Sequence, residues 1–314
     1  MDGWIILALV GSGLVLLSLI TAAICFFKIF YRQKEQTERY PIPPGKIYEA
    51  YRDQLIAWMM EIDEMPHEDI EIKSFDGLTL RGRYYEYKKD APTEILFHGY
   101  RGTSYRDLCG GVYRCHALGR NALIVDHRAS GRSDGKVITF GAKESRDILT
   151  WVEYFVRERD ENAKIIITGI SMGAASVLCA SGYPLPKNVV GVLADCGYTS
   201  TRDIIKKVIR DMKLPANILY PFARLGAILF GGFDPDKRSA IDTMKRCKLP
   251  TIFFHGDADD FVPAYMSEEN YTACAAEEKR LVIIKGAGHG LAFPHSQEEY
   301  LTALRDFFEP ILER

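Results

Sequence analysis

Apolar residues follow three different patterns along this chain, and the first is a single long run. From Trp4 to Phe27 there are 24 residues without a charged side chain. At about 1.5 Å per residue, a helix over this run is about 36 Å long, which is enough to cross a hydrocarbon core of ~30 Å. We therefore predict one N-terminal transmembrane helix over residues 4–27. The alternatives are a cleaved signal peptide and a buried core helix.

The polar segment that follows the run, residues 28–46, contains several prolines and is predicted to be a linker. The basic residues that flank the apolar run all lie after it and none precedes it: Lys28, Arg32, Lys34 and Arg39. By the positive-inside rule, the remainder of the chain faces the cytoplasm. The expected arrangement is a single-pass membrane protein with a cytoplasmic domain over residues 47–314.

The second pattern is an alternation of apolar and polar residues, and the third is a series of short continuous apolar runs. Residues 68–75 and 78–87 alternate on either side of Asp76-Gly77, which predicts a β-hairpin. The continuous runs are residues 94–97, 122–125, 164–168, 189–193, 251–254 and 281–284. Helical patterns lie between most of them, as at residues 105–118, 143–159 and 172–181. This α/β alternation predicts a mostly parallel sheet with an antiparallel N-terminal hairpin and helices on both faces.

Residues 197–249 depart from the alternation and are predicted to form a small helical cap over the sheet. An apolar helical stripe that includes Ile204, Ile205 and Ile209 is followed by a largely apolar stretch, residues 218–230. Between residues 199 and 246 there are ten Lys or Arg residues but only five acidic residues, all of them Asp. The cap is therefore both apolar and basic.

Composition excludes several classes of protein. With 47% hydrophobic and 26% charged residues, the chain has ordinary globular usage, and a net charge of −2 gives no reason to expect nucleic-acid binding. Seven scattered cysteines do not form a disulfide framework, and no Cys/His cluster has zinc spacing. We find no phosphate loop or dinucleotide motif, so no metal and no cofactor is expected.

The candidate nucleophile is Ser171, in Gly169-Ile170-Ser171-Met172-Gly173. The motif lies between a predicted buried strand and a predicted helix, which is the setting of a G-x-S-x-G nucleophile elbow. Glycines on both sides allow a sharp turn that lifts the serine hydroxyl out of the sheet. The alternative is a glycine-rich turn with a capping serine.

A nucleophilic serine needs a base, and the base needs an acid to orient it. His289 lies in the glycine-rich loop after the last predicted strand, and His295 is a second candidate for the base. The loop after the preceding strand carries three candidate acids, Asp257, Asp259 and Asp260, and a fourth candidate, Asp195, follows the strand at residues 189–193. We expect His98 and His255 to hold loops by hydrogen bonds.

Five motifs in this order resemble the α/β-hydrolase superfamily over about residues 68–310: HGYRG from His98, DHRASGRSDG from Asp126, GISMG from Gly169, HGDADDFVP from His255 and GAGHG from Gly286. In more detail, the chain resembles the membrane-anchored relatives of serine aminopeptidase-like and BEM46-like hydrolases. The resemblance implies the α/β-hydrolase fold, with Ser171 as nucleophile, His289 as base and Asp259, in the D-x-x-V-P spacing, as acid. It also implies an oxyanion hole formed by the backbone N–H groups of Tyr100 and Met172.

The expected activity is hydrolysis of a carboxylic ester through an acyl-enzyme. A serine peptidase or aminopeptidase-like hydrolase, an acyltransferase, and a non-catalytic membrane-tethered binding module are the alternatives. The basic, apolar cap favours a small-molecule or lipid acyl ester with an anionic head over a substrate amine, unless the cap is only a solvated basic face.

Overall fold

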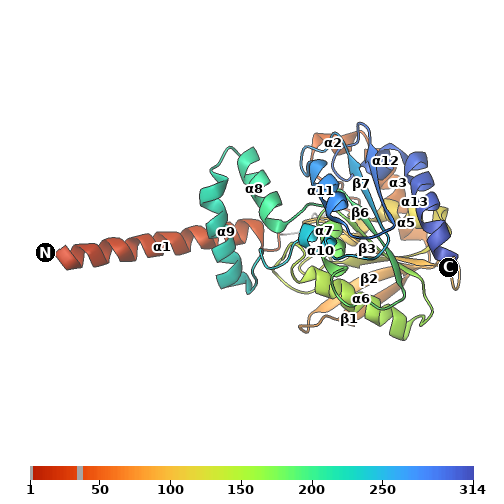
Figure 1. Ribbon diagram of the computed structural model, residues 1–314, viewed down its shortest axis with the longest axis horizontal. Coiled ribbons are helices and arrows are strands. Elements are labelled where there is room, and N and C mark those ends of the chain that lie inside the picture. The colour runs from red at the N-terminus through yellow and green to blue at the C-terminus, as the bar shows by residue number, and fades with distance from the viewer. Residues whose placement is uncertain (1–2, 34–37) are drawn as a thin grey trace.

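The computed structural model describes residues 3–33 and 38–314. One long helix, α1 (Gly3–Ile29), projects from an α/β body, and the C-terminus lies at the opposite end of the molecule (Figure 1). The strands are β1 (Glu68–Lys73), β2 (Thr79–Tyr85), β3 (Thr93–Phe97), β4 (Asn121–Asp126), β5 (Ile165–Ile170), β6 (Val189–Asp195), β7 (Thr251–Gly256) and β8 (Lys279–Ile284). The remaining helices are α2 (Lys46–Glu49), α3 (Arg52–Glu64), α4 (Ser104–Asp107), α5 (Cys109–Ala117), α6 (Glu144–Glu158), α7 (Met172–Ala180), α8 (Thr201–Asp211), α9 (Ala216–Gly231), α10 (Ala240–Met244), α11 (Tyr265–Ala273), α12 (Ala292–His295) and α13 (Gln297–Leu312).

The eight strands form one sheet in the order β1-β2-β4-β3-β5-β6-β7-β8. The β1–β2 and β2–β4 pairs are antiparallel, and every other neighbouring pair is parallel. The predicted hairpin is therefore confirmed, with Gly77 at a φ of +91° in the turn, where a side chain would be strained. Each of the six continuous apolar runs forms a strand of this sheet.

Helices cover both faces of the sheet, which explains why the inner strands lack alternation. On β3, Ile95 and Phe97 point into one apolar core, beside α6, α7, α10 and α11, whereas Leu96 points into the other, beside α3, α5, α12 and α13. Successive strand residues face opposite sides, so a strand buried on both faces needs apolar residues at every position. Each fully buried Ile, Leu or Phe side chain contributes about 1.5–3 kcal/mol.

A buried ionic cluster connects β3 to α5. Glu94 on β3 is inaccessible to solvent, and its carboxylate lies 2.6 Å from both the Arg114 and Arg120 guanidinium groups. The Thr168 hydroxyl on β5 donates a third bond at 3.0 Å. Although burial by itself raises the pKa of this carboxyl, the two arginines outweigh it and lower the pKa to about 2. The group therefore ties α5 to the centre of the sheet in its ionised form.

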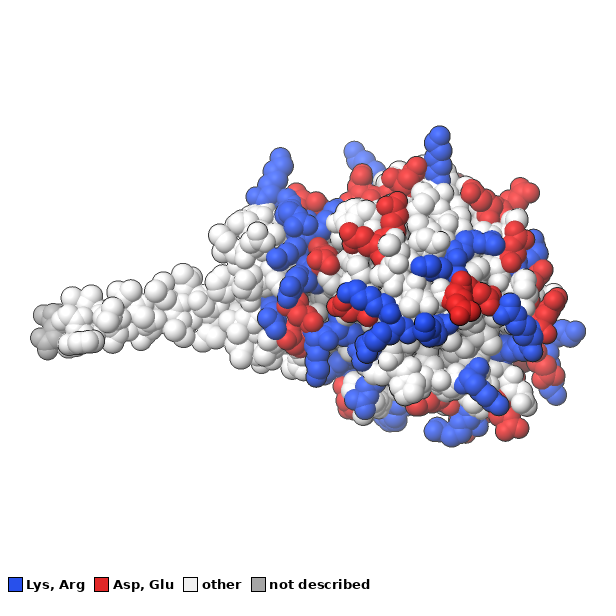
Figure 2. Space-filling view, in the orientation of Figure 1, with Lys and Arg blue, Asp and Glu red and all other residues white. Residues whose placement is uncertain are grey.

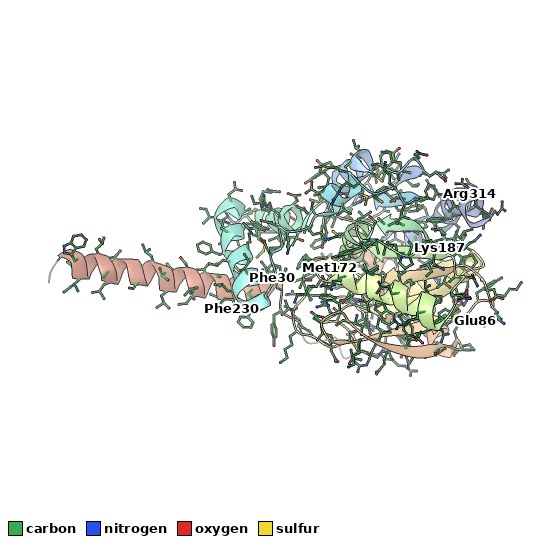
Figure 3. The ribbon with its side chains drawn as sticks, turned by 60° about the horizontal axis from the view of Figure 1, so that its bottom comes forward. Phe30, Glu86, Met172, Lys187, Phe230 and Arg314 are labelled. Carbon is green, nitrogen blue, oxygen red and sulfur yellow. The ribbon has the colours of Figure 1, made fainter. Side chains whose placement is uncertain are left out.

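The predicted cap forms helices α8 and α9, which share a third apolar core with the end of α1. Phe26 and Phe30 are buried in this core, and Phe30 packs edge-on against Phe140 and Phe233. Figure 3 shows Phe30 and Phe230 beside the end of α1, with Met172 further into the body. The cap and the predicted transmembrane helix are thus packed against each other.

Helix α1 contains the predicted transmembrane segment and is long and apolar enough to cross a membrane, a property that a signal sequence would share. The segment predicted to be a linker is in contact with the body where it is described. The Arg32 backbone N–H donates to the Lys136 carbonyl at 2.8 Å, and its guanidinium donates to the Ser133 and Gly131 carbonyls. Lys34 lies outside the described residues.

Candidate active site

Ser171 occupies a sharp turn between β5 and α7. Its φ of 55° and ψ of −115° are unusual for a residue with a side chain and cost on the order of 1–3 kcal/mol. A Cβ at Gly169 would lie 2.2 Å from the backbone of Gly173, and a Cβ at Gly173 would lie 2.0 Å from the Phe97 carbonyl oxygen. Both glycines are therefore required, and the turn has the geometry expected of a nucleophile elbow.

Three of the predicted side chains meet at the carboxyl edge of the sheet. His289 Nε2 lies 2.9 Å from Ser171 Oγ, and His289 Nδ1 lies 2.7 Å from Asp259 Oδ2. The serine follows β5, the aspartate follows β7 and the histidine follows β8. Carboxyl ends of parallel strands point to one edge, so residues more than a hundred positions apart are brought into hydrogen-bonding distance.

Asp259 is held as an ionised acceptor. Its Oδ1 accepts backbone bonds from Phe261 at 2.9 Å and Val262 at 2.8 Å, and its side chain is buried. Although burial by itself raises the pKa of this carboxyl, hydrogen bonds from His255 and His289 outweigh it and hold the pKa well below its usual range. The aspartate can therefore orient the imidazole and stabilise its protonated form.

The other candidate acids are directed elsewhere. Asp257 is exposed and accepts a bond from the Gly286 backbone N–H at 2.6 Å, and Asp260 is exposed on the same loop. Asp195 is buried at the end of β6, where its carboxylate accepts a bond from the Tyr300 hydroxyl at 2.9 Å.

The remaining candidate histidines also have other partners. His295 Nδ1 lies 2.6 Å from the Tyr51 hydroxyl. His98 Nε2 accepts a bond from the backbone N–H of His127, so its Nδ1 carries the proton and donates to the Gly99 carbonyl. His255 contacts the Ser267 hydroxyl and the Val262 carbonyl, each at 2.7 Å, and its Nε2 lies 3.3 Å from Asp259 Oδ2. These contacts confirm that His98 and His255 hold loops.

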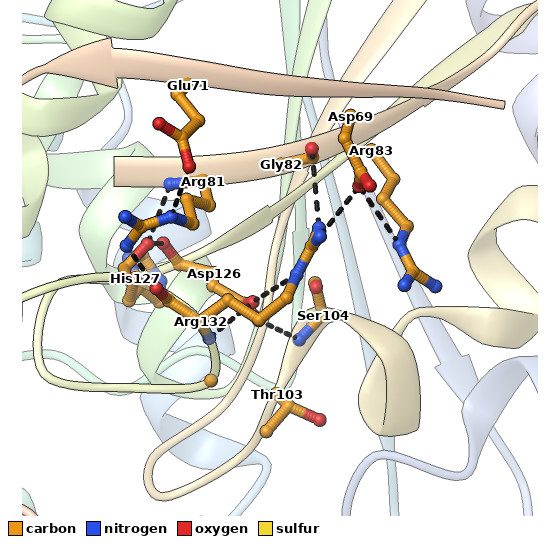
Figure 4. A network of polar contacts seen from close by, with 12 residues as sticks. Asp69, Glu71, Arg81, Gly82, Arg83, Thr103, Ser104, Asp126, His127 and Arg132 are labelled. Carbon is orange, nitrogen blue, oxygen red and sulfur yellow. Dashed lines mark hydrogen bonds and ion pairs between the residues drawn. The ribbon is translucent and has the colours of Figure 1, made fainter. Parts of the chain in front are cut away.

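The motif that begins at Asp126 orders a loop beside the site. The Asp126 carboxylate accepts backbone N–H bonds from Ser104 at 2.8 Å and Arg132 at 3.0 Å (Figure 4). A Cβ at Gly131, whose φ is +49°, would lie 2.3 Å from the same carboxylate. The Asp126 side chain therefore holds the surrounding backbone in place by hydrogen bonds, and it connects the start of α4 to the loop after β4.

The loop that carries Tyr100 passes next to Ser171. An ideal Cβ at Gly99 would lie 3.5 Å from the Ser171 Cβ, and Met172 is the first residue of α7. The Tyr100 hydroxyl donates to the Ile29 carbonyl at 2.6 Å, and burial raises the pKa of this phenol to about 12, so it stays a neutral donor. The predicted oxyanion loop is thus bonded directly to the end of α1.

A cavity of about 1010 Å³ opens beside Ser171 and His289. Its walls include Arg32, Ile47 and Tyr48, which belong to the segment between the apolar run and the sheet. Sequence reasoning missed these residues. The Tyr48 hydroxyl donates to the His289 carbonyl at 3.0 Å, and burial raises the pKa of Tyr48 above its usual range. The prolines of this segment predicted a linker and gave no sign that its residues line the site.

A buried thiol, Cys196, lies beside the Asp259–His289 pair, and its sulfur lies within 4.8 Å of the ligand atoms of both residues. Burial, together with the Asp195 and Asp259 carboxylates, raises the pKa of this thiol well above its usual value. Cys196 is therefore a neutral neighbour of the pair, and no sequence pattern indicated its position.

Comparison with solved structures identifies the fold. The chain superposes on the esterase Pf2001 of Pyrococcus furiosus with a TM-score of 0.67 and 23% sequence identity, covering 88% of this chain and 99% of the esterase. The sheet order, the N-terminal hairpin and the helices on both faces agree with this likeness. The molecule has the α/β-hydrolase fold, as the motifs implied.

Comparison with related sequences shows which α/β-hydrolases the chain resembles. No protein-family model matches the chain. Over 253 residues, 79% of this chain and 81% of the relative, it is 26% identical to YqkD of Bacillus subtilis. Over 221 residues, 69% of this chain and 68% of the relative, it is 24% identical to bem46 of Schizosaccharomyces pombe. These comparisons confirm the resemblance to BEM46-like α/β-hydrolases.

Proposed function

We propose that this chain is a serine hydrolase that cleaves carboxylic esters. The observation that carries the proposal is the hydrogen-bonded series Ser171–His289–Asp259, with separations of 2.9 and 2.7 Å, at the edge of a large cavity. The similarity to an esterase over nearly all of that protein supports the same class of reaction.

The first half of the reaction forms an acyl-enzyme. Ser171 Oγ attacks the ester carbonyl carbon while His289 Nε2 accepts the hydroxyl proton, and Asp259 stabilises the resulting imidazolium. The negative charge that develops on the carbonyl oxygen is stabilised by the backbone N–H groups of Tyr100 and Met172, and one such donor is worth about 2.7–4 kcal/mol. Collapse of the tetrahedral intermediate breaks the C–O bond, and His289 gives its proton to the departing alcohol.

The second half returns the enzyme to its starting state. A water molecule loses a proton to His289 Nε2 and attacks the acyl carbon, and the serine leaves with that proton. The products are a carboxylic acid and the free serine hydroxyl. Every proton is carried by residues of this chain, so the scheme requires no cofactor.

The substrate is a small-molecule or lipid acyl ester, and the enzyme acts at a membrane surface. The apolar helix α1, followed by Lys28 and Arg32, supports a single-pass anchor with the catalytic domain in the cytoplasm. When intact cells are treated with an external protease, the catalytic domain should not be cleaved. Cleavage of the domain without cell lysis would show that it lies outside the cytoplasm.

Hydrolysis of p-nitrophenyl esters from acetate to palmitate by the full chain in detergent tests the activity. Ser171→Ala should reduce kcat by roughly 10⁴- to 10⁶-fold. Ser181→Ala is the matched control, because its hydroxyl bonds the Leu178 carbonyl at the far end of α7 from Ser171. An optimum in acyl length would measure the substrate pocket.

A fluorophosphonate probe separates the alternatives to an esterase. Labelling that depends on Ser171 without ester turnover would favour the peptidase or the acyltransferase, and aminoacyl, peptide and acyl-acceptor substrates would be tested next. A folded protein that is not labelled at Ser171 would be a binding module, and the proposal would be wrong.

A further inference from the structure

The two halves of α1 have different surroundings. Every side chain from Gly3 to Leu17 is exposed, whereas Ala22 and Phe26, nearer the body, are buried against α9. Figure 1 shows the first half free of the body and the second half crossed by α9. The apolar composition nevertheless continues without a break through both halves.

The free half is too short to cross a bilayer. Residues 3–17 make a helix about 22 Å long, whereas a hydrocarbon core is about 30 Å thick and needs about 20 residues. A span of about 20 residues that begins at Gly3 extends to Ala22, where α9 crosses α1. If α1 crosses the membrane, α9 must therefore enter the same leaflet.

The outer surface of α9 suits that environment. Ile218, Leu229 and Phe230 are 62%, 52% and 47% exposed, although they are large and apolar. The one charged residue of the helix, Arg224, is paired with Asp234 at 2.7 Å. An apolar helix of this length with an apolar exposed side is typical of segments that lie in a membrane interface.

We propose that α9 is an interfacial membrane helix that lies in the same leaflet as the second half of α1, so that the catalytic domain is docked on the bilayer instead of hanging from a flexible tether. This inference rests on the proposed membrane anchor. The partner is the lipid of the cytoplasmic leaflet, and the docking surface consists of the exposed side of α9 and the Met212–Leu214 turn before it.

Basic residues lie within and beside the docking surface. Lys213 lies within the Met212–Leu214 turn and Arg210 lies one turn earlier, both exposed, and Lys28 is exposed at the end of α1. Figure 2 shows the projecting part of α1 without charged side chains, and a band of Lys and Arg side chains where the cap meets the body. Cations at this level would meet the anionic headgroups of the cytoplasmic leaflet.

The contact between α1 and α9 is close enough to fix their relative orientation. An ideal Cβ at Gly226 would lie 2.3 Å from the Ala22 carbonyl oxygen, so the two backbones touch at the crossing. Small residues that allow such an approach are typical of helix packing within lipid. The Tyr100 and Arg101 side chains then bond the Ile29 and Lys28 carbonyls, which joins the crossing to the cavity wall. A docked α9 would therefore hold the cavity at the lipid surface.

Site-specific fluorescence in proteoliposomes tests the proposal. The full chain carries Cys25→Ala, since the other six cysteines are buried. Single cysteines are introduced as Ile218→Cys, Leu229→Cys, Leu14→Cys in the free half of α1, and Met60→Cys, which replaces a side chain on α3 that is 48% exposed. Each variant is labelled with bimane in vesicles of phosphatidylcholine and phosphatidylglycerol, with a nitroxide on the lipid acyl chain as quencher.

The expected result is a loss of fluorescence for Leu14→Cys, Ile218→Cys and Leu229→Cys, and no loss for Met60→Cys. Quenching of Leu14→Cys alone would retain the anchor but place α9 in water, and the proposal would be overturned. If a second copy of the chain covers α9, the two cap positions escape lipid quenching but cross-link between copies, which also overturns it. Without quenching of Leu14→Cys, both the anchor and the docking are wrong.

Discussion

The catalytic edge of the sheet and the junction between α1 and the cap are both assembled from distant parts of the chain, but only the first follows a topological rule. Ser171 and His289 are 118 residues apart, yet each follows a parallel strand, and parallel strands deliver their carboxyl ends to one edge. At the junction, Gly226 on α9 lies against the Ala22 carbonyl on α1, with no strand ends to predict the contact. Sequence motifs therefore predict which residues form the catalytic site, whereas the contact between α1 and the cap depends on tertiary packing.

The largest effect is expected at the catalytic edge, from Asp259→Asn. The asparagine amide can donate to His289 Nδ1, which favours the imidazole tautomer with its proton on Nε2, where it cannot accept the Ser171 proton. We expect kcat for ester hydrolysis to fall by about 10⁴-fold, with the melting temperature measured alongside.

Asp260→Asn is the matched control for this variant, since Asp260 is the adjacent residue and is exposed. Its kcat should be unchanged. An inactive Asp260→Asn together with a fully active Asp259→Asn would reverse the assignment of the acid.

Within the sheet, Glu94→Gln should lower the free energy of unfolding by roughly 3–5 kcal/mol, because it leaves the buried charges of Arg114 and Arg120 without their anion. The folded pKa of about 2 lies below the unfolded value of about 4.3. The ionised carboxylate therefore stabilises the fold above pH ~4.3, and this contribution is lost as the pH falls toward about 2. Urea unfolding at several pH values measures both effects.

Glu68→Gln provides the comparison, because Glu68 pairs with Arg159 at the surface and is 55% exposed. It should cost at most about 1 kcal/mol. Equal losses for the two variants would show that the Glu94 cluster does not support the sheet.

The sequence allowed the sheet, the hairpin, the nucleophile turn and the candidate side chains to be predicted, because each depends on a local pattern. A buried strand, a glycine on each side of Ser171 and a glycine-rich loop at His289 are all visible within a few residues. The partners of Glu94, the thiol of Cys196 and the contacts of residues 28–33 depend on tertiary packing. The hydrophobic pattern of a segment does not indicate which side chains of other elements it will contact. The segment predicted to be a linker is an example, because it packs against the body.

At the junction, Gly226→Leu should disrupt the crossing of α1 and α9. Its Cβ would lie 2.3 Å from the Ala22 carbonyl oxygen, so the helices must separate at a cost of roughly 1–3 kcal/mol. Hydrogen exchange of the α9 amides in the full chain should accelerate, while fluorophosphonate labelling of Ser171 persists. Gly13→Leu is the control, since a Cβ at Gly13 meets nothing within 4 Å. Unchanged exchange in both variants would contradict the close contact.

The smallest effect is expected for the hydrogen bond that connects the end of α1 to the catalytic loop. Tyr100→Phe removes the bond from the hydroxyl to the Ile29 carbonyl, 2.6 Å long, but keeps the backbone N–H that we assign to the oxyanion hole. A lost hydrogen bond of this kind is worth about 0.5–1.5 kcal/mol, so kcat should fall by roughly 2- to 12-fold with KM little changed. Tyr105→Phe is the control, because its hydroxyl bonds Asp63 on α3, and its kcat should be unchanged. If both variants behave alike, the end of α1 does not position the catalytic loop, and the anchor and the active site are independent.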